Sequence, residues 1–160
     1  MAANGAGWGL VQAGISLGAV FNGLASGATA ETAAITIPLV TNATAATPQE
    51  ADIELVMSAA ITTGSGTPNV QAVWITADSG SNYDVYGVSS LQLFPFGREE
   101  FHQETLLSST AYSVLRFRMA LPPVASTTTG GPKLVIFNNT GVAFAATVTA
   151  TAYPVGSDIG

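Results

Sequence analysis

Apolar and polar side chains alternate with a period of two in several runs after Glu31. The clearest run spans residues 112–121, where apolar side chains stand at every second position: Leu115, Phe117, Met119 and Leu121. Arg116 and Arg118 stand between them, so in an extended strand they point to the opposite side. A helix cannot keep this alternation on one face, because its period is 3.6 residues. The pattern predicts a strand with one buried face and one exposed face.

Two further runs alternate in the same way. Residues 52–61 place five apolar side chains on one face: Ile53, Leu55, Met57, Ala59 and Ile61. Residues 142–152 place apolar side chains on one face and threonines on the other: Val142, Phe144, Ala146 and Val148 opposite Thr147, Thr149 and Thr151. Runs rich in β-branched residues predict more strands at 33–40, 69–77, 83–88 and 133–138.

Residues typical of turns separate these strands. Residues 62–68, 122–132 and 138–141 are rich in Gly, Pro, Asn and Thr, which suits connections between antiparallel strands. About seven or eight short strands with such spacers predict an all-β fold. We expect a single β-sandwich over residues 31–160, of jelly-roll or immunoglobulin-like type. The length of 160 residues fits one such domain.

Residues 1–30 depart from this pattern. They hold no charged side chain and many glycines, with large apolar residues spaced among them: Trp8, Val11, Ile15, Leu17 and Phe21. Such a segment is too flexible to fold by itself. We interpret residues 1–30 as a glycine-rich N-terminal arm whose five apolar residues contact a neighbouring subunit. The alternative is that the segment adds a strand to its own sandwich, as chain termini often do.

Charged residues make up only 9% of the chain, compared with roughly 25% in an ordinary soluble domain. Ala, Thr, Ser, Gly and Asn replace them. Such a surface suits contact with other protein, because little charge must be desolvated. We therefore expect a homo-oligomer, with a trimer as the favoured form. The alternative is a neutral, Thr-rich sheet surface on a monomer.

Charge and composition argue against several partners. The net charge is −6, with four basic residues in the whole chain: Arg98, Arg116, Arg118 and Lys133. So few cations neutralise few phosphates, which argues against nucleic-acid binding. Residues 8–25 are apolar but interrupted by glycines and polar residues, so we expect no membrane span. The chain has no cysteine, which excludes disulfides and thiolate metal sites.

Two segments invite a metal. His102 could join Glu100 and Glu104 at alternate positions of a strand, but a single imidazole lacks the usual ligand set for zinc or iron. We interpret that segment as a solvated, charged surface. Residues 78–84 alternate oxygen-bearing side chains in the manner of a calcium loop, yet the closing glutamate is missing. There we expect a hairpin loop held by Asx turns.

The chain shows no pattern typical of catalysis. The single histidine has no surroundings resembling a triad, and neither a G-x-S-x-G elbow nor a phosphate-binding loop occurs. We therefore expect a protein that is not an enzyme and has no cofactor and no metal.

Three stretches carry a resemblance to a known group of proteins. The first is Trp74-Ile75-Thr76 together with residues 78–84. The second is residues 117–123, which end in a Leu-Pro-Pro turn. The third is residues 133–141, which begin with a Lys-Leu-Val strand and end in an Asn-Asn-Thr-Gly turn. In order and spacing the chain resembles small virion structural proteins of tailed bacteriophages over its C-terminal two thirds. The resemblance implies a part of a virion. Within it we favour a capsid decoration or cement protein, commonly a trimer, that contacts the major capsid protein or another virion protein. Because the chain is acidic, we expect it on the outer capsid surface, away from packaged DNA.

Two other functions remain open. A tail- or fibre-associated module could bind a host glycan through aromatic side chains exposed near loops, for which Trp74, Tyr83 and Tyr86 are the candidates. A secreted bacterial β-domain would explain the glycosylation sequons at 42–44 and 138–140. No signal peptide is apparent, which counts against the second of these.

Overall fold

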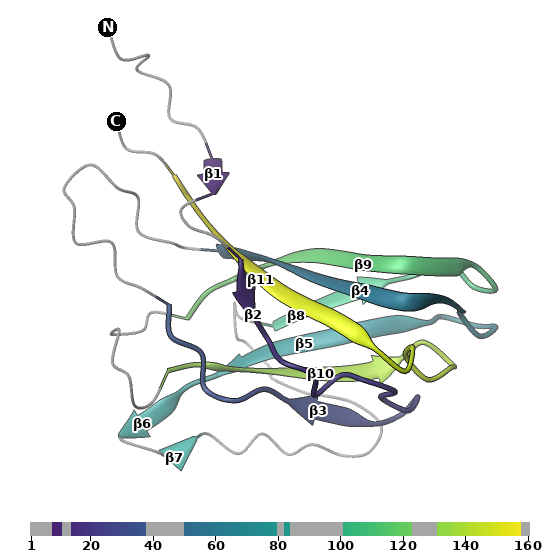
Figure 1. Cartoon of the computed structure of the whole chain (residues 1–160), viewed down its shortest axis with the longest axis horizontal. Helices are drawn as coiled ribbons and strands as arrows, with labels where there is room; N and C mark the ends of the chain where they lie inside the picture. The colour runs from purple at the N-terminus through teal and green to yellow at the C-terminus, as the bar shows by residue number, and fades with distance from the viewer. Residues whose placement is uncertain are drawn as a thin grey trace, which may run out of the picture.

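The computed structural model describes residues 8–10, 14–37, 50–79, 82–83, 101–122 and 131–157. Every regular element within these ranges is a β-strand, and the strands form two facing antiparallel sheets (Figure 1). No helix in this part of the chain is long and apolar enough to cross a membrane. The expected all-β sandwich is confirmed.

One sheet, which we call sheet A, contains β1 (Trp8–Leu10), β2 (Ile15–Ser16), β11 (Val148–Ser157), β4 (Glu50–Thr62) and β9 (Ala111–Ala120). Sheet B contains β3 (Thr29–Glu31), β10 (Lys133–Asn139), β5 (Asn69–Ile75) and β8 (Phe101–Thr105). A small hairpin joins β6 (Ala77–Ser79) to β7 (Asn82–Tyr83). The strand order is β1-β11-β4-β9 in sheet A, with β2 also paired to β11, and β3-β10-β5-β8 in sheet B.

The pairing of the strands is nested. In chain order, β2 pairs with β11, β3 with β10, β4 with β9, and β5 with β8, always antiparallel. The first strand of this series therefore meets the last, the second meets the last but one, and so on inward. Successive pairs lie alternately in sheet A and sheet B, so the chain winds around one core.

The alternating runs supply the sheet A side of that core. On β9, Leu115, Phe117 and Met119 are buried, whereas Arg116 and Arg118 are exposed on the opposite face, as predicted. On β4 the buried residues are Ile53, Leu55, Met57 and Ile61. Ala59 was predicted to be buried but is exposed, because the pairing between β4 and β9 shifts register between Val56 and Ile61.

The central strands of sheet B are buried on both faces. Trp74 of β5 and Ile136 of β10 face the core between the sheets, while Val73, Ile75, Val135 and Phe137 form a second apolar cluster. Tyr83 and Phe101 pack against that second cluster. This explains why β5 and β10 read as continuous apolar runs, since a strand covered on both sides needs no polar face.

Residues 14–31 contribute directly to the sandwich. Ile15 pairs with Ala152 of β11, and the Leu17 amide donates to the Ala150 carbonyl at 2.9 Å. Leu17 and Phe21 are buried in the core of their own chain, Phe21 with no exposed surface. Residues 14–31 thus follow the second of the two interpretations, in which the segment joins the sheets of its own chain. The edge of β11 offers this segment backbone hydrogen-bond partners.

The rest of the expected arm is described in part. The backbone of Trp8 pairs with Ser157 in β1, and Val11 lies outside the described residues. β3 crosses the domain boundary expected at residue 30. A contact between the N-terminal segment and a neighbouring subunit stays a prediction.

Two predicted strands are displaced. Residues 33–37 are not a strand, although Thr32 and Ile35 donate backbone hydrogen bonds to the carbonyls of Leu134 and Pro132. The regular strand lies just before them, at β3. The run predicted at 142–152 begins as a strand only at Val148, because the backbone of Phe144 bonds to Leu24 instead of a neighbouring strand. Of the strand predicted at 83–88, only Tyr83 lies within the described residues.

Asn138 holds one end of the sandwich together through a buried side chain. Its amide nitrogen donates to the carbonyls of Leu24 at 2.8 Å and Val142 at 2.9 Å. Its amide oxygen accepts from the backbone and the hydroxyl of Thr140 at 3.0 and 2.8 Å. Asn138 and Thr140 both have no exposed surface. We call this set of contacts the Asn138 network.

The two faces of β9 predict very different mutational costs. Phe117→Ala should lower the free energy of unfolding by about 3–5 kcal/mol, because it empties a core position. Arg118→Ala should cost no more than about 1 kcal/mol, because its ion pair is partly exposed. Urea denaturation of both variants checks this, and equal losses would contradict the assignment of the faces.

Removing the Asn138 side chain should cost much more than removing that of its neighbour. Asn138→Ala removes the acceptor of the buried Thr140 amide, at about 1–3 kcal/mol for that unsatisfied group. It also removes one of the two donors to each of the Leu24 and Val142 carbonyls, which keep the Phe144 amide and the Thr140 hydroxyl. Asn139→Ala is the matched control, because Asn139 is the next residue of β10, is half-buried and makes no side-chain hydrogen bond within the described residues. Thermal and urea unfolding of the two variants should differ clearly. Similar stabilities would show that the network is dispensable.

Candidate interaction surface

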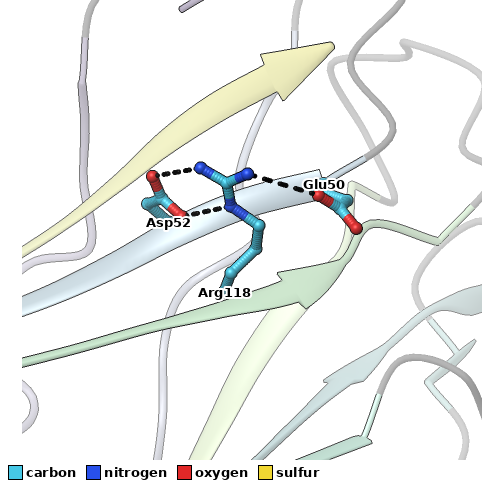
Figure 2. Close-up of polar contacts among 3 residues, drawn as sticks. All are labelled: Glu50, Asp52 and Arg118. Carbon is cyan, nitrogen blue, oxygen red and sulfur yellow. Dashed lines mark hydrogen bonds and ion pairs between the residues drawn. The ribbon is translucent and has the colours of Figure 1, made fainter. Parts of the chain in front are cut away.

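The outer face of sheet A carries a ladder of opposite charges. Acidic side chains stand on β4 directly across from basic side chains on β9, with Asp52 opposite Arg118 and Glu54 opposite Arg116. The Arg118 guanidinium binds Asp52 through two bonds, of 2.7 and 2.9 Å, and lies 3.8 Å from Glu50 (Figure 2). Arg116 forms an ion pair with Glu54. We call these five residues the charge ladder.

The ladder shifts the protonation equilibria of its members. The hydrogen bonds from Arg118 lower the pKa of Asp52 below its ordinary value of 3.8. In turn the hydrogen bond to Asp52 raises the pKa of Arg118, and the bond to Glu54 raises the pKa of Arg116. Both changes favour the ionised pairs. The arginines are therefore engaged by carboxylates of their own chain.

The third described cation is engaged as well. Lys133 Nζ lies 2.5 Å from Glu31 Oε1 and 4.2 Å from the centroid of the Tyr83 ring. Each lysine or arginine in the described residues thus has an acidic partner within the chain. A surface of this kind offers no free cation in these ranges for phosphate.

Beside the ladder the same face becomes uncharged. Val56 and Val114 are direct cross-strand partners, and both are exposed, by 37% and 43%. On the other side of β4, Thr149 is exposed and pairs with Val56. The outer face of sheet A therefore combines compensated charges with small and apolar side chains, which suits contact with another protein surface.

A groove opens at the opposite edge of the sandwich. It has a volume of about 420 Å³ and runs between residues 15–20 and residues 32–36. Its lining contains no charged side chain. The polar lining residues are Ser16, Thr32 and Thr36, and one of the apolar ones, Val20, is 42% exposed.

His102 serves the packing of the two sheets. Its ring stacks on Phe117 of β9, with centroids 5.1 Å apart and planes 7° apart. Its Nε2 lies 3.0 Å from Glu104 Oε2. Glu100, the third member of the metal hypothesis, lies outside the described residues, and no group of three possible ligands occurs within them.

The other sequence candidates can be placed in part. Most of the possible calcium loop at 78–84 lies outside the described side chains. Of the aromatic residues considered for a glycan, Trp74 is buried, and its indole nitrogen has no hydrogen-bond partner among the described residues. Tyr83 is half-buried, and its hydroxyl donates to the Gly131 carbonyl at 2.8 Å. Tyr86 lies outside the described residues, so these residues provide no exposed aromatic platform in the described part of the chain.

Comparison with known proteins gives no relative. No family model, no curated protein and no solved structure matches the chain. The resemblance to phage virion proteins therefore stays a prediction.

Sequence reasoning missed the charge ladder. The signal was present, because Glu50, Asp52 and Glu54 alternate along one strand while Arg116 and Arg118 alternate along another. Pairing them required knowing that β4 and β9 are neighbours in the correct register.

The Asp52–Arg118 pair predicts a pH-dependent contribution to stability. At neutral pH, Asp52→Asn should lower the free energy of unfolding by roughly 0.2–1 kcal/mol, as expected for a partly exposed pair. Because the folded-state pKa of Asp52 is lowered, this contribution is complete above the unfolded-state pKa and is lost as pH falls through the folded-state pKa. The wild type and the variant should converge in stability at a pH well below 3.8.

Urea denaturation across the acid range measures this convergence. In an Arg118→Ala background, Asp52→Asn should have little effect at any pH, which provides the control. A difference that stays constant from neutral to acid pH would show that the carboxylate charge of Asp52 is irrelevant.

Proposed function

We propose that this chain is a virion structural protein of a tailed bacteriophage, most specifically a capsid decoration or cement protein. It works through protein–protein contacts and performs no chemical step. The observation that carries this proposal is the nested strand pairing, in which the first strand meets the last in sequence and each inner pair follows.

The nested pairing favours the jelly-roll alternative over the immunoglobulin-like one. A jelly roll results when a long antiparallel hairpin of eight strands is wound into two four-stranded sheets. The orders β2-β11-β4-β9 and β3-β10-β5-β8 have this connectivity. Jelly rolls are frequent in viral capsid proteins and in lectins. The jelly-roll connectivity is therefore compatible with a capsid protein and with a glycan-binding module, and it does not decide between these functions.

The surface supports the capsid alternative. The outer face of sheet A has compensated charges and an exposed Val56–Val114 pair, which would lose little hydration on contact with protein. The glycan alternative depends on exposed aromatic side chains, but Trp74 is buried and the Tyr83 hydroxyl is already bonded. A glycan-binding tail or fibre module is thus the second candidate.

Charge supports a place on the outside of the capsid. The chain has a net charge of −6, and the described cations already have acidic partners. Packaged DNA would repel such a protein, whereas an outer position leaves it in solvent. Its partners there are other copies of itself and the major capsid protein or another virion protein. The resemblance implies a trimer of these copies, whereas the edge of β9, which is unpaired in the described structure, favours a two-fold pair.

Attachment to particles tests this proposal. The purified chain should cosediment with capsids that lack it, and the binding should saturate. Attachment should change little when salt rises from about 0.1 to about 0.5 M, because few uncompensated charges are screened. DNA of the same length as the packaged genome should show no binding under the same conditions.

A glycan panel provides the contrasting measurement. Specific, saturable binding to a host glycan, together with no attachment to capsids, would replace the leading proposal with the tail-module alternative. If the chain neither attaches to capsids nor binds a glycan, both proposed functions are wrong.

A further inference from the structure

We infer that two copies of this chain associate edge to edge through β9, which extends sheet A across a two-fold axis close to Val114. The inference concerns self-contact and is tested with purified protein, so it stands or falls separately from the proposed place on a capsid. It rests on four features of β9: its position, its length, the direction of its charges and its exposed apolar residue.

β9 ends sheet A. Its only strand partner in the described structure is β4, and no other backbone hydrogen bond of its ten residues is found there. Every second residue of an edge strand directs its N–H and C=O groups outward, where they can pair with another strand. The remaining edge strands among the described residues are shorter, with β1, β2 and β3 at two or three residues and β8 at five.

β9 lacks the usual protection of an edge. It contains neither proline nor glycine, and the register irregularity adjacent to it places its extra residues in β4. Arg118 extends over β4 to Asp52 (Figure 2). Arg116 forms its ion pair with Glu54, which also lies on β4. Charged side chains on an edge strand normally discourage pairing with another chain, but these two arginines point away from the edge of β9.

The exposed apolar residue lies at the same edge. Val114 is 43% exposed although its cross-strand neighbour is Val56. Exposure at this level means that none of the described residues covers the Val114 side chain. A strand added to β9 would shield this side chain from water and would satisfy the outward backbone groups.

The two arginines of β9 restrict the register in which two copies of this strand can pair. In an antiparallel pair of β9 strands, centring on Arg116 or Arg118 would place arginines opposite arginines, which is destabilising. Centring on Val114 places Val114 opposite its copy, Arg116 opposite Tyr112 and Arg118 opposite Thr110. This register joins the exposed apolar side chains and keeps the like charges apart. A second copy of the chain satisfies it with two-fold symmetry, which closes the assembly at two chains.

The experiment uses two variants with opposite charges. Light scattering of the wild type at micromolar concentration should give twice the mass of one chain. Val114→Lys and Val114→Glu should each weaken the dimer at least roughly tenfold, because like charges would then meet at the axis. An equimolar mixture of the two variants should restore a dimer, since Lys and Glu would face each other.

A matched control and a crosslink complete the test. Thr149→Lys stands in the same row of the same face, two strands from the edge, and should leave the dimer intact. Because the chain has no cysteine, Val114→Cys should form one disulfide-linked dimer on oxidation, and Thr149→Cys should not. A wild-type monomer or trimer, a dimer insensitive to Val114→Lys, or a mixture that fails to reassociate would each overturn the inference.

Discussion

The buried amide of Asn138 is the contact on which the closed end of the sandwich depends. Three connections meet there, and their backbone groups would be unsatisfied in the core without polar partners. Asn138 binds the N-terminal segment at Leu24 and the following turn at Val142. The Gly64 amide donates to Thr140, and the space between Gly64 and Gly141 is too small for a side chain on either. These contacts hold the connections together at the end of the sandwich where the nested strands turn.

With that end fixed, the two sheets acquire different roles. Sheet B is apolar on both faces at β5 and β10, so its central strands belong to the interior. Sheet A presents one face to the core and the other to solvent. On that outer face the arginines of β9 bind acidic side chains of β4, which stabilises the pairing of these two strands and also removes free charge from the surface. One set of contacts thus supports both the fold and the suitability of the face for protein contact.

Sequence patterns predicted the strands that have one solvent-exposed face, and they were less informative for the other segments. Residues 52–61 and 112–121 alternate, and their buried faces were confirmed apart from Ala59, where a register shift adds residues that no pattern reveals. The strand predicted at 33–40 failed over 33–37 because backbone bonds to residues 132–134 hold that segment without regular pairing. Asn138 was predicted as part of a turn only, because its burial depends on Leu24, which is distant in sequence. The charge ladder needed the register of β4 against β9, which is a tertiary property.

The distribution of acidic residues explains how a chain with a net charge of −6 can still present a compensated face. Five of the ten acids lie between residues 78 and 104, where Arg98 is the single base. Three others form the charge ladder with two arginines, and Glu31 pairs with Lys133. The excess negative charge is therefore concentrated in one stretch of sequence, whereas the three acids and two arginines of the charge ladder nearly compensate each other. Contacts made by such a nearly neutral sheet face should be weakened little by salt, because few uncompensated charges are screened there.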